Sequence, residues 1–177
     1  PREDVPGAIA TLRRLLDARP DDVEALSRLA QLCKAQGRSS ELADVLVRLV
    51  ETTEEGSTAR LEAQLELARL RVDLGDFSAG QSLLREIVAV EPAHEAARDF
   101  LQERFEDAVA EEDAALAESY GEMLSDALRH TEEANGLIAV LRMRAQTVRS
   151  SVERAPMLQE VAELYDEKLE QPELAFT

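Results

Sequence analysis

Apolar residues recur along the chain at the three-and-four spacing of amphipathic helices, and short polar stretches separate the runs. In the first run, Ile9, Leu12, Leu15 and Leu16 fall on one stripe. The same spacing predicts helices over residues 5–18, 22–36, 40–52, 59–74, 77–90 and 114–129. Gly37 and Gly75 hold equivalent positions at the ends of two runs, where helix C-caps often have glycine. The pattern therefore predicts an all-α chain.

Residues beside these runs predict where some helices begin and end. Pro20 closes the first helix, and the acidic pair Asp21 and Asp22 is suited to open the second. Ser39 or Ser40 is expected to cap the third helix, because a serine hydroxyl can accept a hydrogen bond from a free backbone N–H in the first turn.

An internal repeat links these helices. The positions Ala8, Leu12, Leu15 and Pro20 recur 34 residues later as Leu42, Leu46, Leu49 and Glu54, and again, after a four-residue insertion, as Gly80, Leu84, Ile87 and Pro92. A period of about 34 residues is typical of helix-turn-helix arrays. One unit alone cannot bury its apolar face, so neighbouring units must stack into a solenoid.

The repeat weakens after His94. The acidic stretch that follows allows either one long helix or a break near Ala110–Asp113. Thr131 is expected to open another helix, and Ser150 or Ser151 the last one.

We therefore divide one continuous solenoid into regular repeats over 1–93, a divergent region over 94–154 and a partial repeat over 155–177. Gly121 lies inside a predicted helix, where glycine costs about 1 kcal/mol relative to alanine unless close packing requires it.

The repeated pattern resembles the tetratricopeptide repeat (TPR) family. The residues that carry the resemblance are Leu26, Leu29, Ala30 and Cys33 for the first helix of a unit, Leu42, Leu46 and Leu49 for the second, and Pro20 and Pro92 for the closing proline. The best match to the first-helix motif is Leu158, Val161, Ala162 and Tyr165, whereas Gln64, Leu67, Ala68 and Arg71 keep only its centre and Glu54 departs from the proline. The match covers 8–92 well and 155–176 partly, and Sel1-like or HEAT-like arrays remain alternatives.

The resemblance implies a right-handed α-solenoid of stacked antiparallel helix pairs, with about nine or ten helices. It also implies a non-catalytic scaffold that holds a protein or peptide along the concave face formed by the first helices. The concave-face residues would be Glu24, Ser27, Arg28, Gln31, Lys34, Leu65, Glu66, Arg69, Val72 and Asp73, with Gln159, Glu160, Glu163, Asp166 and Glu167 in the last unit. A merely solvated polar face is the alternative for each. The Lys, Asn and Arg clamp that one TPR subclass uses for acidic tails is replaced here largely by Ser, Gln and Glu.

Charge narrows the possible partners. The formal net charge is −17, from 37 acidic and 20 basic residues, so phosphate backbones and anionic membranes are disfavoured. A basic or amphipathic protein segment is the favoured partner, although high charge also serves solubility alone. No run approaches the roughly 20 apolar residues of a membrane span, and a soluble, cytoplasmic protein is favoured. The basic residues are almost all Arg, which with the high Ala content hints at a GC-rich bacterial genome.

Candidate chemistry is sparse. Cys33 stands alone among apolar helical positions and is expected to be buried. His94 and His130 lie near predicted helix ends, without metal-ligand spacing, and suit surface or capping roles. The acidic residues Glu103, Glu106, Asp107, Glu111, Glu112 and Asp113 read as a hydrated face. We therefore predict no catalysis, no metal and no cofactor.

A structural role is the alternative to a binding scaffold. Both ends of the sequence cut through repeats, and Leu174 and Phe176 near the C-terminus have nothing after them to cover them. On this reading the chain is a fragment of a longer protein, and its exposed repeat ends stack end to end, within a larger assembly or as a homo-oligomer.

Overall fold

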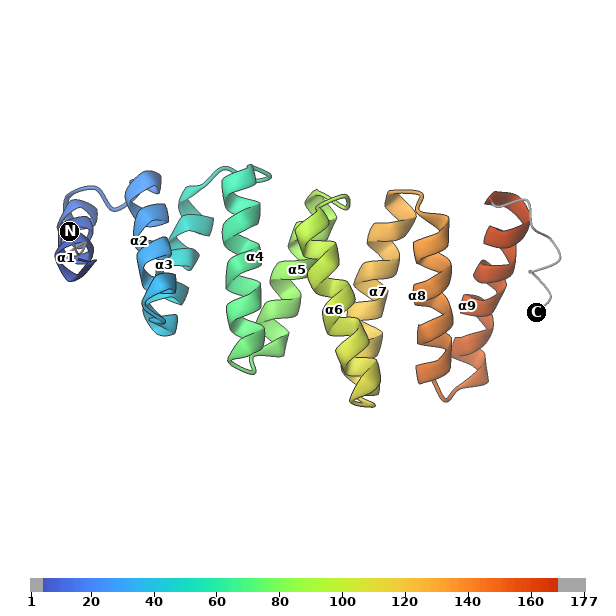
Figure 1. The fold of residues 1–177 in the computed structure, drawn as a ribbon. Helices are drawn as coiled ribbons and strands as arrows, with labels where there is room; N and C mark the ends of the chain where they lie inside the picture. The colour runs from blue at the N-terminus through green and yellow to red at the C-terminus, as the bar shows by residue number, and fades with distance from the viewer. Residues whose placement is uncertain (1–4, 169–177) are drawn as a thin grey trace. The chain divides into compact units, whose positions relative to one another are not determined.

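The structure is a computed structural model that describes the backbone of residues 5–168 and the side chains of residues 5–166. This range contains nine α-helices and no strand (Figure 1). The helices are α1 (Val5–Ala18), α2 (Val23–Ala35), α3 (Ser39–Thr52), α4 (Thr58–Asp73), α5 (Phe77–Val90), α6 (Glu95–Ala110), α7 (Ala114–His130), α8 (Ala134–Thr147) and α9 (Ser151–Glu163), followed by a π-helical turn (Leu164–Lys168). The predicted all-α class is confirmed.

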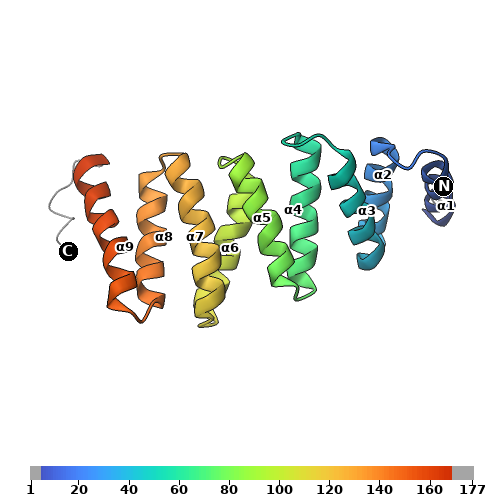
Figure 2. The same ribbon diagram turned by 180° about the vertical axis from the view of Figure 1, so that it is seen from behind.

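The chain forms two compact units, residues 1–84 and 85–177, and α5 crosses the boundary between them. In the first unit α1 packs on α2, α2 on α3 and α3 on α4. In the second unit α6 packs on α7, α7 on α8 and α8 on α9. Consecutive helices within each unit run antiparallel, as both views show (Figures 1 and 2).

Each unit buries the apolar stripes of its helices. Leu26 and Cys33 are fully buried in the first unit, and Leu101, Phe105 and Leu141 are fully buried in the second. Burying one such large side chain contributes roughly 1.5–3 kcal/mol, so these stripes supply the main force that pairs the helices. The prediction that Cys33 is a buried packing residue is confirmed.

Several helix starts follow the predicted capping. Asp22 caps α2 by accepting a hydrogen bond from the Ala25 N–H at 3.0 Å. His94 caps α6, because its Nδ1 accepts from the Ala97 N–H at 3.2 Å, which confirms the capping role. Ser150 occupies the N-cap position of α9, but its side chain makes no capping hydrogen bond.

Two predicted caps are wrong. Ser39 is already the first helical residue of α3, and the N-cap is Arg38, whose side chain makes no capping hydrogen bond. Thr131 does not open α8. It ends α7, where its Oγ1 donates to the carbonyl of Ala127 at 3.2 Å.

The acidic stretch after α6 contains a break, so the long-helix alternative is wrong. Glu112 adopts a left-handed conformation with φ 58°. The Asp113 N–H donates to the Ala108 carbonyl at 2.9 Å, and the Glu112 N–H donates to the Val109 carbonyl at 3.2 Å. This pair of bonds is the Schellman pattern that ends many helices.

The alternation of helices gives α9 the place of a second helix in its repeat. Leu158, Val161 and Ala162 of α9, with Tyr165 of the π-helical turn, resemble a first helix in sequence, but chain order places α8 first and α9 second. Val161 is buried and Leu158 is 47% exposed, so only part of that motif packs inward.

Candidate binding surface

The first unit contains a groove between the first helices of two consecutive repeats, α2 and α4. Its floor is made by Leu42, Leu46 and Leu49 of α3, and its walls by polar and small residues of α2 and α4. We call it the α2–α4 groove, lined by Ser27, Ala30, Gln31, Cys33, Lys34, Gly37, Arg38, Ser39, Leu42, Leu46, Leu49, Ala59, Glu62, Ala63, Glu66, Arg69, Leu70 and Asp73. The sequence produces this floor because every third or fourth residue of α3 is apolar.

One ion pair crosses the groove. The Lys34 ammonium lies 2.7 Å from the Glu66 carboxylate, and both residues line each of two hollows of about 320 and 220 Å³. The two side chains are 64% and 29% exposed. A pair so open to water contributes at most about 1 kcal/mol, so a ligand can displace it at little cost.

The hollow nearer the helix N-termini contains Glu62 and Glu66 as its acidic residues. The hollow nearer the C-termini adds Arg38, Arg69 and Asp73. The groove therefore offers charges of both signs above an apolar floor, an arrangement suited to a peptide with mixed side chains.

A further hollow lies between α1 and α2. It is lined by Leu12, Leu15, Asp22, Glu24, Ala25, Ser27, Arg28 and Gln31. Ser27 and Gln31 border both this hollow and the α2–α4 groove. A chain lying across α2 could contact both.

Eight of the ten predicted first-unit residues line these hollows. They are Glu24, Ser27, Arg28, Gln31, Lys34, Glu66, Arg69 and Asp73. Leu65 and Val72 are 7% and 5% exposed and pack inward, so their side chains cannot reach a ligand. On α4 the residues that line the groove and the residues that face the core are neighbours in sequence. The apolar pattern of the sequence therefore does not distinguish the two groups.

The residues predicted for the last unit lie on α9 and beyond it. Gln159 donates to Glu163 at 2.9 Å, and Glu160 is held by Arg129. Asp166 is exposed, and the side chain of Glu167 lies outside the described residues. Three of these residues, Gln159, Glu160 and Glu163, are therefore already bound to protein groups.

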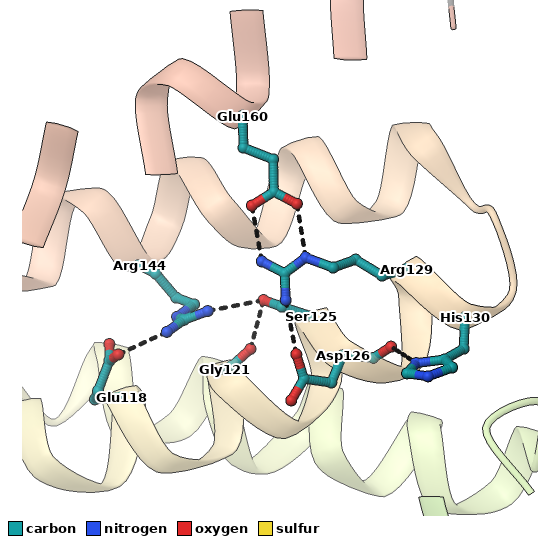
Figure 3. A network of polar contacts seen from close by, with 8 residues as sticks. All are labelled: Glu118, Gly121, Ser125, Asp126, Arg129, His130, Arg144 and Glu160. Carbon is teal, nitrogen blue, oxygen red and sulfur yellow. Dashed lines mark hydrogen bonds and ion pairs between the residues drawn. The ribbon is translucent and has the colours of Figure 1, made fainter. Parts of the chain in front are cut away.

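The second unit contains a polar cluster that the sequence did not predict (Figure 3). Arg144 of α8 is only 6% exposed and donates to Glu118 Oε1 at 2.6 Å and to Ser125 Oγ at 3.1 Å. Ser125 in turn donates to the Gly121 carbonyl at 2.6 Å. Both terminal nitrogens of the buried guanidinium are therefore paired with α7, whereas its Nε has no hydrogen-bond partner among the described residues. These two contacts fix α8 on α7.

Gly121 is required by this contact. A Cβ at this position would lie 2.8 Å from Cγ and Cδ of Arg144 and 2.9 Å from the ring of Phe105. Of the two alternatives that the sequence left open, a costly glycine or one that close packing requires, the structure supports the second.

Arg129 ties α7 to α9 beside this cluster (Figure 3). It donates to both carboxylate oxygens of Glu160, from Nε at 2.6 Å and from Nη2 at 2.8 Å, and to Asp126 at 2.7 Å. The hydrogen bonds from Arg129 hold the pKa of Glu160 below its ordinary value, and the same bonds raise the pKa of Arg129. The His130 Nδ1 lies 2.8 Å from the Asp126 carbonyl, so this histidine occupies a helix end, as expected.

Ion pairs between next-but-one helices recur in both units. They are Arg13–Glu41 (α1 to α3), Lys34–Glu66 (α2 to α4), Arg98–Glu133 (α6 to the N-cap of α8) and Arg129–Glu160 (α7 to α9). In each pair the basic residue precedes the glutamate, by 28, 32, 35 and 31 residues respectively. A search for opposite charges spaced by about one repeat could have found these pairs in the sequence.

The described residues offer little for other chemistry. No group of three or more His, Cys, Asp or Glu residues among them could hold a metal ion. No described helix is both long enough and apolar enough to cross a membrane.

No protein-family model matches the sequence, and no curated protein is significantly similar to it. Solved structures are similar to the chain. A variant of a Podosopora anserina putative kinesin light chain with nearly identical TPR-like repeats is 19% identical, with 94% of this chain and 89% of that chain covered and a TM-score of 0.50. Another structure of those repeats is 20% identical over 96% and 83% of the two chains (TM-score 0.43), and MamA is 17% identical over 98% and 83% (TM-score 0.48).

The likeness to the kinesin light chain variant concerns the fold alone. Together with the nine helices of the described residues, it shows that the chain has a TPR-like helical-repeat fold.

Proposed function

We propose that this protein is a non-catalytic scaffold that holds a peptide segment of a partner protein in the α2–α4 groove. TPR-like folds commonly mediate protein–protein interactions. The observation that carries the proposal is the groove itself, in which the leucine floor of α3 lies between walls that present charges of both signs. An apolar floor supplies affinity, and the charged walls select the ligand.

The ligand is a basic or amphipathic segment. In the hollow nearer the helix N-termini, Glu62 and Glu66 form an acidic wall, and Lys34 is the one basic residue that lines it. The formal net charge of −17 adds a long-range attraction for basic segments. A Lys or Arg of the ligand would replace Lys34 at Glu66, while an apolar side chain would lie on the floor.

The test is selection of binders from a displayed library of random peptides, followed by affinity measurements on purified variants. The groove variant is Glu66→Lys with Arg69→Glu, which leaves the net charge unchanged. The matched control is Asp44→Lys with Arg14→Glu, a charge exchange at exposed residues of α3 and α1 that line neither the groove nor its neighbouring hollow. We expect the groove variant to weaken the selected peptides by at least about tenfold, the effect of roughly 1.4 kcal/mol. Equal binding by both variants would place the ligand elsewhere.

Self-association through α9 is the second candidate function. Val152 is 81% exposed and Leu158 is 47% exposed, so α9 presents apolar side chains to solvent. Leu174 and Phe176, which first suggested an open end, lie outside the described residues. Light scattering over a range of concentrations tests this candidate. A concentration-dependent increase in mass that Val152→Asp with Leu158→Asp abolishes would support it, and a monomer at every concentration would exclude it.

A further inference from the structure

The second unit contains a hollow on its second helices, α5 and α7, which the α2–α4 groove does not include. Its volume is about 420 Å³, within the range of roughly 300–1,000 Å³ that is typical of ligand pockets. We call it the α5–α7 hollow, lined by Arg85, Val88 and Ala89 of α5 and Glu122, Met123, Asp126, Ala127 and His130 of α7.

The hollow has an apolar floor and a charged rim. Val88, Met123 and Ala127 are buried side chains that form the floor. Arg85 and Glu122 are exposed on the rim, and within the described residues neither side chain makes a hydrogen bond or an ion pair. Small side chains at Ala89 and Ala127 leave the space between the two helices open.

The other next-but-one helices of the second unit are tied together. Arg98 binds Glu133 at the start of α8, and Arg129 of α7 binds Glu160 of α9. In the α5–α7 hollow the opposite charges of Arg85 and Glu122 face the same space without such a contact. A ligand can therefore bind both without breaking an existing ion pair, unlike a ligand at Lys34 and Glu66.

Asp126 contributes less to the rim than its charge suggests. Its carboxylate accepts from Arg129 at 2.7 Å, and its carbonyl lies 2.8 Å from His130 Nδ1 (Figure 3). Glu122 is consequently the available acidic group of the hollow, and Arg85 is the available basic group.

We infer that the α5–α7 hollow is a second docking site, which takes a segment of a partner protein with one apolar anchor side chain between a basic and an acidic residue. The anchor fills the space above Val88 and Met123. The basic residue of the segment pairs with Glu122, and its acidic residue pairs with Arg85. Each new pair forms at the edge of a closed apolar contact, where charges select the partner more than they add affinity.

The test is a selection from a displayed library of random peptides on the full chain, with the recovered peptides measured on two variants. Ala89→Phe fills the hollow from an exposed helical position, so it leaves the core intact. Arg85→Glu with Glu122→Arg reverses the rim without changing the net charge. We expect peptides with an apolar residue flanked by opposite charges, at least about tenfold weaker binding to Ala89→Phe, and a preference for the reversed charge order on the exchanged rim.

Two controls keep the outcome specific to the hollow. The groove variant, Glu66→Lys with Arg69→Glu, should bind these peptides as the unaltered chain does, so failure of the groove proposal leaves this one testable. Circular dichroism melting curves should show that each variant is folded. Equal binding by Ala89→Phe, or no recovered peptide with this pattern, would overturn the inference. Dimerisation that Ala89→Phe abolishes would also overturn it, because a second copy of the chain would then be the occupant.

Discussion

In the first unit the turns after α2 and α4 are made by Gly37 and Gly75, whereas in the second unit Glu112 and Glu132 make the turns after α6 and α7. All four residues are left-handed, with φ of 64° and 81° for the glycines and 58° and 57° for the glutamates. All four turns have the same two hydrogen bonds, such as Arg38 N–H to the Cys33 carbonyl at 2.9 Å and Glu133 N–H to the Leu128 carbonyl at 3.1 Å. The turn geometry is therefore shared, and the second unit builds it with a residue that disfavours it.

The units also differ in where they place charge. In the first unit the Lys34–Glu66 pair lies on the surface, while in the second unit Arg144 is buried against Glu118 and Ser125. Desolvation of a buried guanidinium costs several kcal/mol, and the two hydrogen bonds of Arg144 offset only part of this cost, because its Nε has no partner among the described residues. Both units thus depend on their apolar stripes, and the second unit adds a buried polar contact between two of its helices.

The largest expected effect tests that contrast. Arg144→Ala removes the side chain that connects α8 to α7 and should lower the free energy of unfolding by about 3 kcal/mol, the lower end for a broken buried pair, because Glu118 can regain water. Lys34→Ala in the first unit should cost less than about 1 kcal/mol. Urea unfolding of both variants measures the difference. Equal losses would show that burial of Arg144 has no energetic consequence.

The two helix glycines of the second unit give the next largest effect. Gly121→Ala forces the new Cβ against Arg144 and Phe105, and overpacking of about 1–3 kcal/mol exceeds the roughly 1 kcal/mol gained in helix propensity. Gly136→Ala is the matched control, since its Cβ would meet only Leu128, at 3.3 Å. We expect Gly121→Ala to lower the urea midpoint and Gly136→Ala to hold or raise it. A rise with both would mean that α7 and α8 can separate without cost.

Exchanging the turn residues tests whether the turns of both units have the same backbone conformation. Glu112→Gly and Glu132→Gly should each stabilise the protein by about 1 kcal/mol, because glycine accepts a positive φ without steric cost. Gly37→Glu and Gly75→Glu should each destabilise it by a similar amount. Thermal unfolding checks both directions. Stabilisation by Gly75→Glu would contradict a common turn.

The same turns show which helix ends could be predicted from the sequence. Periodicity located the helices, and Gly37 and Gly75 marked two of their ends. The break after α6 remained one of two alternatives, because glutamate at position 112 favours a helix and does not mark a helix end. Thr131 was assigned to the wrong helix, since a threonine can start a helix or end one, and only the packed chain decides.

The candidate site was predictable to a similar depth. The resemblance to the TPR family implied that Lys34 and Glu66 lie on the same face of their units, and the two side chains meet across the groove. The 34-residue period could not separate the wall positions of α4 from Leu65 and Val72, which face the core. The buried contacts of Arg144 reach residues 19 and 26 positions earlier, which is less than one repeat, so no repeat-based comparison indicates them.

The smallest expected effect is a pH dependence that both units share. Arg13 lowers the pKa of Glu41 in the first unit, and Arg129 lowers the pKa of Glu160 in the second. A carboxyl whose folded pKa lies below its unfolded value of about 4.3 stabilises the protein above that pH, and the stabilisation is lost as the pH falls through the folded pKa. Glu160→Gln should therefore reduce the loss of stability between neutral pH and about pH 3 by at most about 1 kcal/mol.

Arg129→Gln should have the same consequence as Glu160→Gln, because the shift in the pKa of Glu160 comes first from its hydrogen bonds with Arg129. Urea unfolding at neutral and acidic pH measures how much the free energy of unfolding of each variant changes with pH. The double variant should show the same change as either single variant. Glu41→Gln gives the equivalent measurement in the first unit, where Arg38 also donates to the carboxylate and shares the role of Arg13. Replacing Arg13 alone should therefore remove less of the pH dependence than replacing Glu41. If Arg13→Gln removed all of the pH dependence that Glu41 contributes, the ion pair between next-but-one helices would be its sole cause in both units.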